Sequence, residues 1–154
     1  MTLNAIQSLH LQHFLPYRLS QLTAHVSETF AKVYQDEYQL SIPEWRILVN
    51  LAEKKSSNAK ELGECAVMDK STVSRTIKLL QQKNYVEKIT DENDKRASLL
   101  TLSRQGNALY QELVPKALAW EAQLLAVLSA PEYRDLMSSI DKLEQQLLRL
   151  KDGI

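Results

Sequence analysis

The chain has 154 residues, 44% of them apolar, and its 19 basic and 19 acidic side chains give a formal net charge of zero. This length suits one domain with its own core, and the single cysteine excludes an internal disulfide framework. The N-terminus lacks the pattern of a signal peptide, and every apolar run is shorter than the roughly 20 residues of a membrane span. We therefore expect a cytoplasmic protein without a membrane partner. The low glycine and proline counts favour a mainly helical fold.

The first third of the chain predicts two helices. Apolar residues recur every three or four positions from 15 to 33, which indicates one apolar helix face, and Pro16 fits the first turn of that helix. Ser41 and Glu44 have the spacing of a capping box, with Pro43 between them. A second helix is therefore predicted to begin at residue 42.

Two short helices joined by a brief turn are predicted next. Asn58 and Glu61 indicate a second capping box, which opens a helix ending near Ala66. Asp69 is expected to cap the following helix, which runs to about Lys83. This pair of helices has the arrangement of a helix-turn-helix.

The hydrophobic period then changes from that of a helix to that of strands. Residues 85–89 and 97–102 predict two short strands, and the charged segment 91–96 predicts the hairpin loop between them. Asn84 can adopt the left-handed backbone conformation that ends a helix, just before the first strand. Ser103 is expected to cap a long helix that is interrupted or kinked at Pro115.

The C-terminal helix carries a regular apolar seam. Ser129 and Glu132 predict its capping box. Its apolar residues alternate between spacings of three and four, which is typical of a seam shared by two helices. These residues are Tyr133, Leu136, Ile140, Leu143, Leu147 and Leu150.

The order of elements predicts a mainly α (α+β) fold over a single chain, residues 1–154. A winged helix-turn-helix lobe with a two-stranded wing is expected at residues 40–104. Long terminal helices at residues 8–38 and 105–152 are expected to form a homodimer, because a monomer would leave their apolar faces exposed.

The charge is unevenly distributed along the chain. Residues 54–104 contain eleven basic and seven acidic side chains, whereas the rest contains eight basic and twelve acidic ones. A basic middle between acidic ends is consistent with phosphate binding, and an ordinary solvated surface is the alternative.

The second helix of the predicted pair carries the side chains of a DNA-reading surface. Small hydroxyls let its backbone approach the major groove, Arg75 can pair with a guanine edge, and lysines suit phosphates. An exposed amphipathic helix without this function is the alternative. The candidate residues are Lys70, Ser71, Thr72, Ser74, Arg75 and Lys78.

The loop of the predicted hairpin supplies a second candidate contact. Lys95 and Arg96 lie beside acidic residues in a segment too polar to pack. An arginine on a loop tip suits the negative potential of a narrow minor groove. Asp94 is expected to hold an arginine side chain in position. A solvated hairpin is the alternative.

Three segments carry a resemblance to a known family. They are residues 40–48 (LSIPEWRIL), residues 69–75 (DKSTVSR), and residues 91–96 (DENDKR) with the downstream Leu102-Ser103-x-x-Gly106. In this order and register, the sequence resembles the MarR family of bacterial transcription regulators.

The resemblance implies a dimeric repressor that places the helix 69–83 of each subunit in successive major grooves of a pseudo-palindromic operator. Arg96 would then be the minor-groove arginine and Asp94 its anchor. Two departures stand out. Lys95 occupies a position where the family often has arginine, and Ala66-Val67 replaces the commoner Leu-Gly in the turn.

The resemblance also implies a small aromatic ligand between the dimer helices and the DNA-binding lobe. Residues 14–20 (FLPYRLS) look like the subgroup that controls the breakdown of aromatic acids, including hydroxycinnamates. Arg18 can clamp a carboxylate and Trp45 can stack on a ring, although core packing and a salt bridge are the alternatives. The ligand candidates are His13, Tyr17, Arg18, Trp45 and Arg46.

Other functions have weaker support. Cys65 offers a thiol-based redox switch as the alternative function, but it has no second cysteine in the chain as a resolving partner. We find no nucleophile with a matched base, no glycine-rich phosphate loop and no metal cluster in the sequence. His10 and His13 form at most a weak metal pair. We therefore expect no enzyme activity, no cofactor and no metal.

Overall fold

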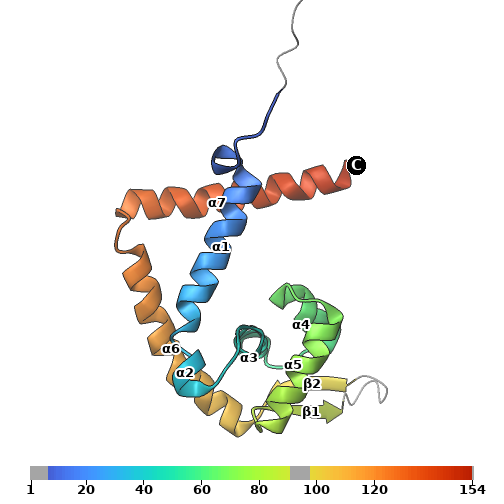
Figure 1. Ribbon diagram of the computed structural model, residues 1–154. Coiled ribbons are helices and arrows are strands. Elements are labelled where there is room, and N and C mark those ends of the chain that lie inside the picture. Colours follow the sequence, from blue (N-terminus) through green and yellow to red (C-terminus); the bar gives the residue numbers. More distant parts are fainter. Residues whose placement is uncertain (1–6, 91–97, 154) are drawn as a thin grey trace, which may run out of the picture. The chain divides into compact units, whose positions relative to one another are not determined.

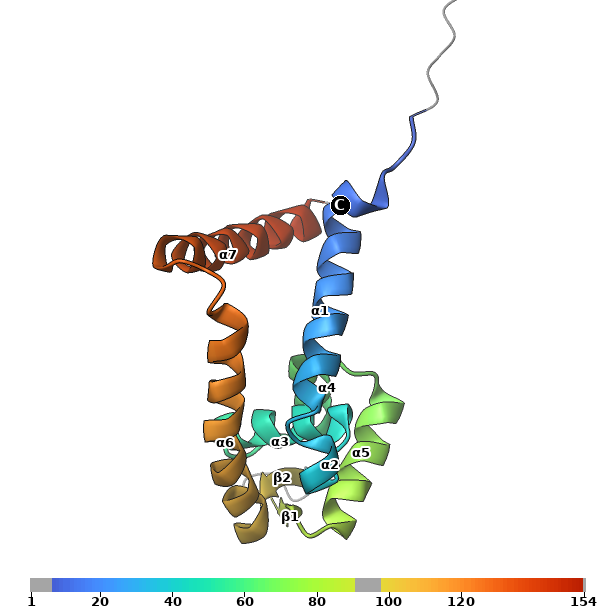
Figure 2. The same cartoon turned by 60° about the vertical axis from the view of Figure 1, so that its left-hand side comes forward.

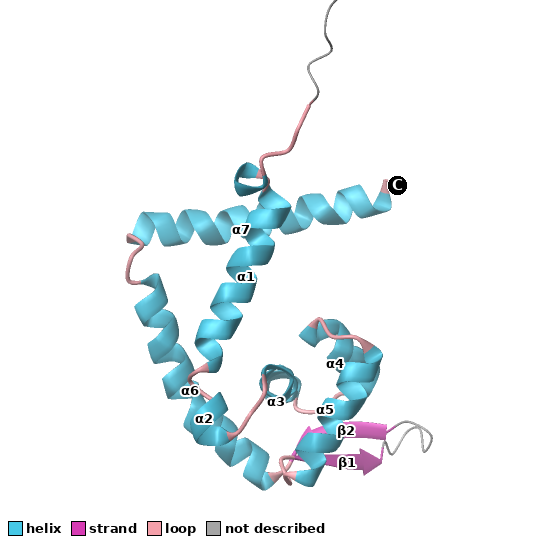
Figure 3. Cartoon of the chain, in the orientation of Figure 1, coloured by secondary structure: helices cyan, strands magenta, loops and turns pink. Residues whose placement is uncertain are grey.

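The computed structural model describes residues 7–90 and 98–153. It is mainly helical with one two-stranded antiparallel sheet, as Figure 3 shows. The chain divides into two compact units, residues 1–115 and 116–154. This content confirms the predicted mainly α fold with a two-stranded wing.

The elements follow the predicted order, with two additions (Figure 1). A 3₁₀ turn, η1, precedes the first helix, and α2 lies in what was expected to be a connection. Both are too short to show a hydrophobic period. The described elements are η1 (Leu11–His13), α1 (Leu15–Ala31), α2 (Gln35–Tyr38), α3 (Ile42–Lys54), α4 (Ala59–Ala66), α5 (Lys70–Gln82), β1 (Val86–Thr90), β2 (Ser98–Leu102), α6 (Arg104–Leu125) and α7 (Ala130–Asp152).

Polar caps fix the beginnings of α3, α4, α5 and α7. The predicted boxes at Ser41 and Ser129 are complete, because each hydroxyl accepts from the amide three residues on and that residue's glutamate returns the bond. The predicted box at Asn58 is only half formed. Asn58 accepts from the Glu61 amide, but the Glu61 carboxylate instead accepts from the Ser57 hydroxyl at 3.2 Å. Buried Ser57 thus competes successfully for the glutamate.

The core of the first unit lies where α3 crosses α5. Leu48 and Leu51 of α3, Leu62 of α4 and Leu80 of α5 are wholly buried. Full burial of each such side chain contributes about 1.5–3 kcal/mol. In Figure 2, α3, α4 and α5 lie around this core together with the hairpin. This packing holds α5 and the wing in one lobe.

A close junction joins the hairpin to the start of α6. The Ser103 hydroxyl donates to the Asn84 carbonyl at 2.6 Å and accepts from the Gly106 amide at 3.0 Å. A Cβ at Gly106 would lie 2.1 Å from the Tyr85 carbonyl oxygen, so only glycine fits there. The Leu-Ser-x-x-Gly motif therefore has a structural cause: its serine caps α6 and its glycine lets that helix touch the chain before β1.

Of the two effects predicted for Pro115, the interruption is wrong, because α6 runs unbroken from Arg104 to Leu125 with this proline inside it. The kink stays a prediction. No described helix, taken singly, is long and apolar enough to cross a membrane; α6 and α7 meet that test of length and composition only as a bent pair. In the second unit, α7 buries none of its side chains. Its seam residues Leu143 and Leu147 are 41% and 62% exposed.

Candidate nucleic-acid interface

The N-terminus of α5 is held by a double hydrogen bond. The two carboxylate oxygens of Asp69 accept separately from the amide and the hydroxyl of Thr72, both at 2.8 Å. These bonds lower the pKa of the Asp69 carboxyl, since they favour its charged form. The Thr72 hydroxyl is therefore engaged in the cap, and the structure gives this predicted contact residue a role in holding the helix.

The remaining candidates on α5 share one exposed face. Val73, Ile77 and Leu80 point into the core as predicted, and Thr76 is buried with its hydroxyl on the Thr72 carbonyl at 2.6 Å. The opposite side of the helix is open to solvent. It carries Lys70, Ser71, Ser74, Arg75 and Lys78, all exposed. The helix thus presents hydroxyl and basic side chains together.

The turn before α5 keeps a left-handed conformation without glycine. Val67, one of the two departures from the family pattern, has φ 56° and ψ 55° and is 82% exposed. A β-branched residue pays a steric penalty in this region. Gly63 explains how α4 still approaches α5, because a Cβ there would lie 3.1 Å from Val73. Val67 in this conformation therefore adds strain to the turn.

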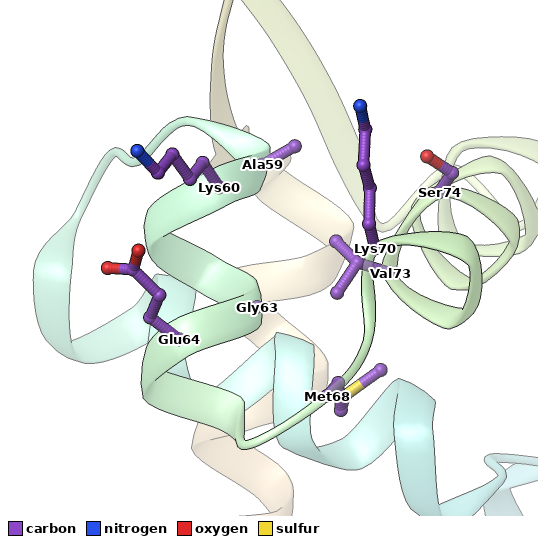
Figure 4. A pocket seen from close by; sticks show the side chains of 8 residues that line it. All are labelled: Ala59, Lys60, Gly63, Glu64, Met68, Lys70, Val73 and Ser74. Atoms are coloured by element: carbon purple, nitrogen blue, oxygen red, sulfur yellow. The ribbon is translucent and has the colours of Figure 1, made fainter.

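Two grooves flank α5. The first, with a volume of about 490 Å³, lies between α4 and α5 (Figure 4). Figure 4 shows Val73 and Met68 between the two helices, and Lys70 along the edge. It is lined by Ala59, Lys60, Gly63, Glu64, Met68, Lys70, Val73 and Ser74.

The second groove, which we name the helix–wing groove, has a volume of about 420 Å³ and lies between α5 and the hairpin. It is lined by Ala59, Ser74, Ile77, Lys78, Gln81, Lys88, Ser98 and Leu100. Sequence analysis missed Gln81, Lys88 and Ser98. The alternation of β1 offered a signal, because Lys88 lies two residues after buried Val86 and so shares its face.

The predicted wing contacts Asp94, Lys95 and Arg96 lie outside the described residues. The strands that lead to them are regular. Val86 pairs with Leu102 at the base of the hairpin, and Thr90 pairs with Ser98 at its outer end. Thr90 and Ser98 are therefore the described residues on either side of these three candidates.

The predicted ligand residues on the N-terminal segment engage local partners. Arg18 donates to the Gln12 carbonyl at 3.1 Å, and the Tyr17 hydroxyl accepts from the Gln21 amide at 3.0 Å. His13 ends η1 and is exposed. Neither groove beside α5 includes any of the five ligand candidates.

Trp45 belongs to an aromatic cluster. Its ring stacks on Tyr34 with 5.1 Å between centroids and meets Phe30 edge-on. Burial raises the pKa of Tyr34 to about 12, against a smaller opposing effect of the Arg46 charge. The structure thus gives Trp45 a packing role and places the half-buried Arg46 beside this cluster.

Cys65 is exposed on α4, and its side chain interacts with Lys54 of α3. A hydrogen bond with the Cys65 side chain raises the pKa of Lys54. Within residues 7–90 and 98–153, no group of three or more His, Cys, Asp or Glu side chains is placed to hold a metal ion.

The capped pair α4–α5, the exposed face of α5 and the following hairpin define a winged helix-turn-helix protein. The sequence profile of the MarR family matches residues 38–97. The HTH-type transcriptional regulator SarZ of Staphylococcus aureus is 31% identical over 80 residues, a match that covers 52% of this chain and 54% of SarZ. The chain thus spans about half the length of the curated relatives it matches.

Solved structures extend the likeness to most of the chain. A MarR/EmrR family transcriptional regulator from Acinetobacter sp. ADP1 has a TM-score of 0.82 at 24% identity, covering 92% of this chain and 99% of that one. BpsR of Bordetella bronchiseptica, whose DNA binding is regulated by 6-hydroxynicotinic acid, has a TM-score of 0.77 at 20% identity, with coverages of 90% and 98%. Residues 38–97 therefore match the MarR family profile, and the chain has the winged-helix fold of these solved structures.

Proposed function

We propose that this protein is a transcription regulator that binds double-stranded operator DNA as a homodimer and represses the genes beside it. The observation that carries the proposal is the exposed basic and hydroxyl face of α5, which follows a rigid N-cap and lies beside a wing. The MarR-family match over the same segment supports it.

In this proposal, α5 enters the major groove with its N-terminal end. Arg75 pairs with a guanine edge, Ser71 and Ser74 allow close approach of the backbone, and Lys70 and Lys78 bind phosphates. Thr72 acts through the cap of α5.

The wing completes the contact in the minor groove. Arg96 enters that groove, Asp94 orients it and Lys95 adds a phosphate contact.

The second subunit docks through the terminal helices. A solvent-exposed apolar seam along α7 is unfavourable in water, and its regular spacing suits a symmetric partner of the same sequence. Two rigidly joined lobes can then contact half-sites about one helical turn apart.

A small aromatic acid releases the protein from its operator. BpsR, regulated by a hydroxylated aromatic acid, supports this class of ligand. Arg18 and Arg46 are the candidates for the carboxylate, and His13, Tyr17 and Trp45 for the ring and its substituents. The ligand acts because it favours one spacing of the two recognition helices.

DNA binding is tested with a duplex selected from random sequence and followed by fluorescence anisotropy. Combined loss of Arg75 and Arg96 to alanine abolishes specific binding, since each contact to bases or the minor groove contributes about 1–3 kcal/mol. Arg134→Ala on α7 is the matched control and leaves affinity unchanged. A double variant that binds as tightly as the wild type refutes the proposed interface.

The switch is tested by a panel of aromatic acids. A true effector weakens operator binding and raises the melting temperature of the protein, because it binds the folded state. Arg18→Gln keeps DNA binding but loses the response. A panel that moves neither quantity refutes this class of ligand.

A further inference from the structure

The helix–wing groove has two polar walls and an apolar floor. On α5, Ser74, Lys78 and Gln81 follow one another at spacings of four and three, so they form one stripe along the helix. Ile77 and Leu100 lie beneath them and are nearly buried. One wall of the groove is therefore a row of donors on α5.

The register of the hairpin explains why Lys88 and Ser98 form the opposite wall of the groove. Lys88 pairs with Leu100, and Thr90 pairs with Ser98. Because Leu100 points into the core, the alternation of the strands directs Lys88 and Ser98 to the same side, toward α5. Two exposed lysines, Lys78 and Lys88, thus face one groove from different elements.

The described side chains that line the groove carry positive charge. Among the described residues, its lining includes two lysines and no carboxylate. Neither lysine makes an ion pair with another described residue. Two ammonium groups beside hydroxyl and amide donors fit a single anion with several oxygens, which is the chemistry of a phosphodiester.

The geometry of a DNA duplex brings a phosphodiester group to the helix–wing groove. The major and minor grooves of B-DNA are separated by one sugar-phosphate strand. When α5 lies in the major groove and the wing in the adjacent minor groove, this strand passes between them. The space between α5 and the wing is the helix–wing groove.

We propose that the helix–wing groove holds the sugar-phosphate strand between the two DNA grooves, with one phosphate shared by Lys78 and Lys88. Gln81 and Ser98 donate to the same segment of backbone, and the sugars lie over Ile77 and Leu100. This inference rests on the proposed function and assigns Gln81, Lys88 and Ser98 to DNA positioning. None of them reads a base.

The test compares wild type and Lys88→Gln on a mixed-sequence duplex and on a selected operator across a salt series. We expect the slope of log affinity against log salt to fall by about 0.9 per subunit, the effect of one phosphate contact. Affinity falls by the same factor on both duplexes, because a phosphate contact carries no sequence information. Lys151→Gln on α7 serves as the charge-matched control and leaves the slope unchanged.

A neutral methylphosphonate placed at successive positions of the operator locates the contact. Wild type loses affinity when the linkage between the major-groove and minor-groove contacts is neutral, and Lys88→Gln shows no further loss there. A misfolded variant would instead lose affinity at every position and show an altered circular dichroism spectrum.

Two outcomes overturn the inference separately from the proposed function. A wild type that binds DNA while Lys88→Gln keeps the full salt slope refutes the phosphate site alone. A loss confined to the operator makes Lys88 a base-reading residue and also refutes it. A wild type that binds no duplex at all refutes the proposed function and the groove with it.

Discussion

Helices α3 and α7 have apolar residues at similar helical spacings but opposite surroundings. In α3, Ile47, Leu48 and Leu51 are wholly buried within the chain. In α7, which is longer, every side chain stays accessible, and Leu143 is 41% exposed. The same periodicity therefore marks a completed core in one region and, in our proposal, half of an interface in the other.

A charge in the seam of α7 gives the largest expected effect. Leu147→Arg prevents self-association, because it places an unpaired charge in the proposed dimer interface. Sedimentation velocity shows a monomer, and operator affinity falls by about 100-fold or more as one lobe loses its partner. The thermal transition of the winged-helix lobe remains.

Gln145→Arg, on the other side of α7, is the control and keeps the oligomeric state. A wild type that is already monomeric, or a Leu147→Arg variant that still self-associates, contradicts the shared interface. The contrast between α3 and α7 would then need another explanation.

Adding a methyl group at Gly106, where α6 touches the chain before β1, gives the second largest expected effect. This effect is on the stability of the winged-helix lobe. Gly106→Ala destabilises the fold by about 1–3 kcal/mol, because its Cβ meets the Tyr85 carbonyl and the backbone must shift. Urea unfolding measures the loss. Gly153→Ala is the matched control, since its nearest contact is an ordinary 3.4 Å. Equal stability of the two variants would show that the junction yields without strain.

Relief of strain in the turn gives the smallest effect. Val67→Gly stabilises the lobe by about 1 kcal/mol, because glycine adopts the left-handed conformation without the penalty of a side chain. Val67→Ala keeps a Cβ at the same φ, so we expect it to gain less stability. This variant distinguishes the relief of backbone strain from the removal of an exposed apolar side chain. An unchanged urea midpoint in Val67→Gly would mean that the turn is not strained.

Local signals predicted most of the fold. The caps at Ser41 and Asp69 and the left-handed Asn84 depend on neighbouring residues, and sequence shows these directly. The half-formed box at Asn58 failed because Ser57, buried against β2, took the glutamate. Such competition depends on tertiary packing.

The candidate site likewise has a part that local sequence predicts and a part that depends on tertiary packing. The exposed face of α5 follows from its own helical period, so sequence predicted it. Lys88 and Ser98 line a groove only because the hairpin packs beside α5, a pairing between distant segments. The aromatic environment of Trp45 likewise comes from α1 and the chain after it, which periodicity within α3 does not reveal.

The Ser103–Gly106 junction has a mechanical consequence. The first turn of α6 is bonded to the backbone at Asn84 and rests on Tyr85, the residue before β1. We therefore expect a tilt of the N-terminal end of α6 to move the backbone just before β1 as well. Under our proposed function, this junction would couple the position of α6 to that of the wing through Ser103 and Gly106.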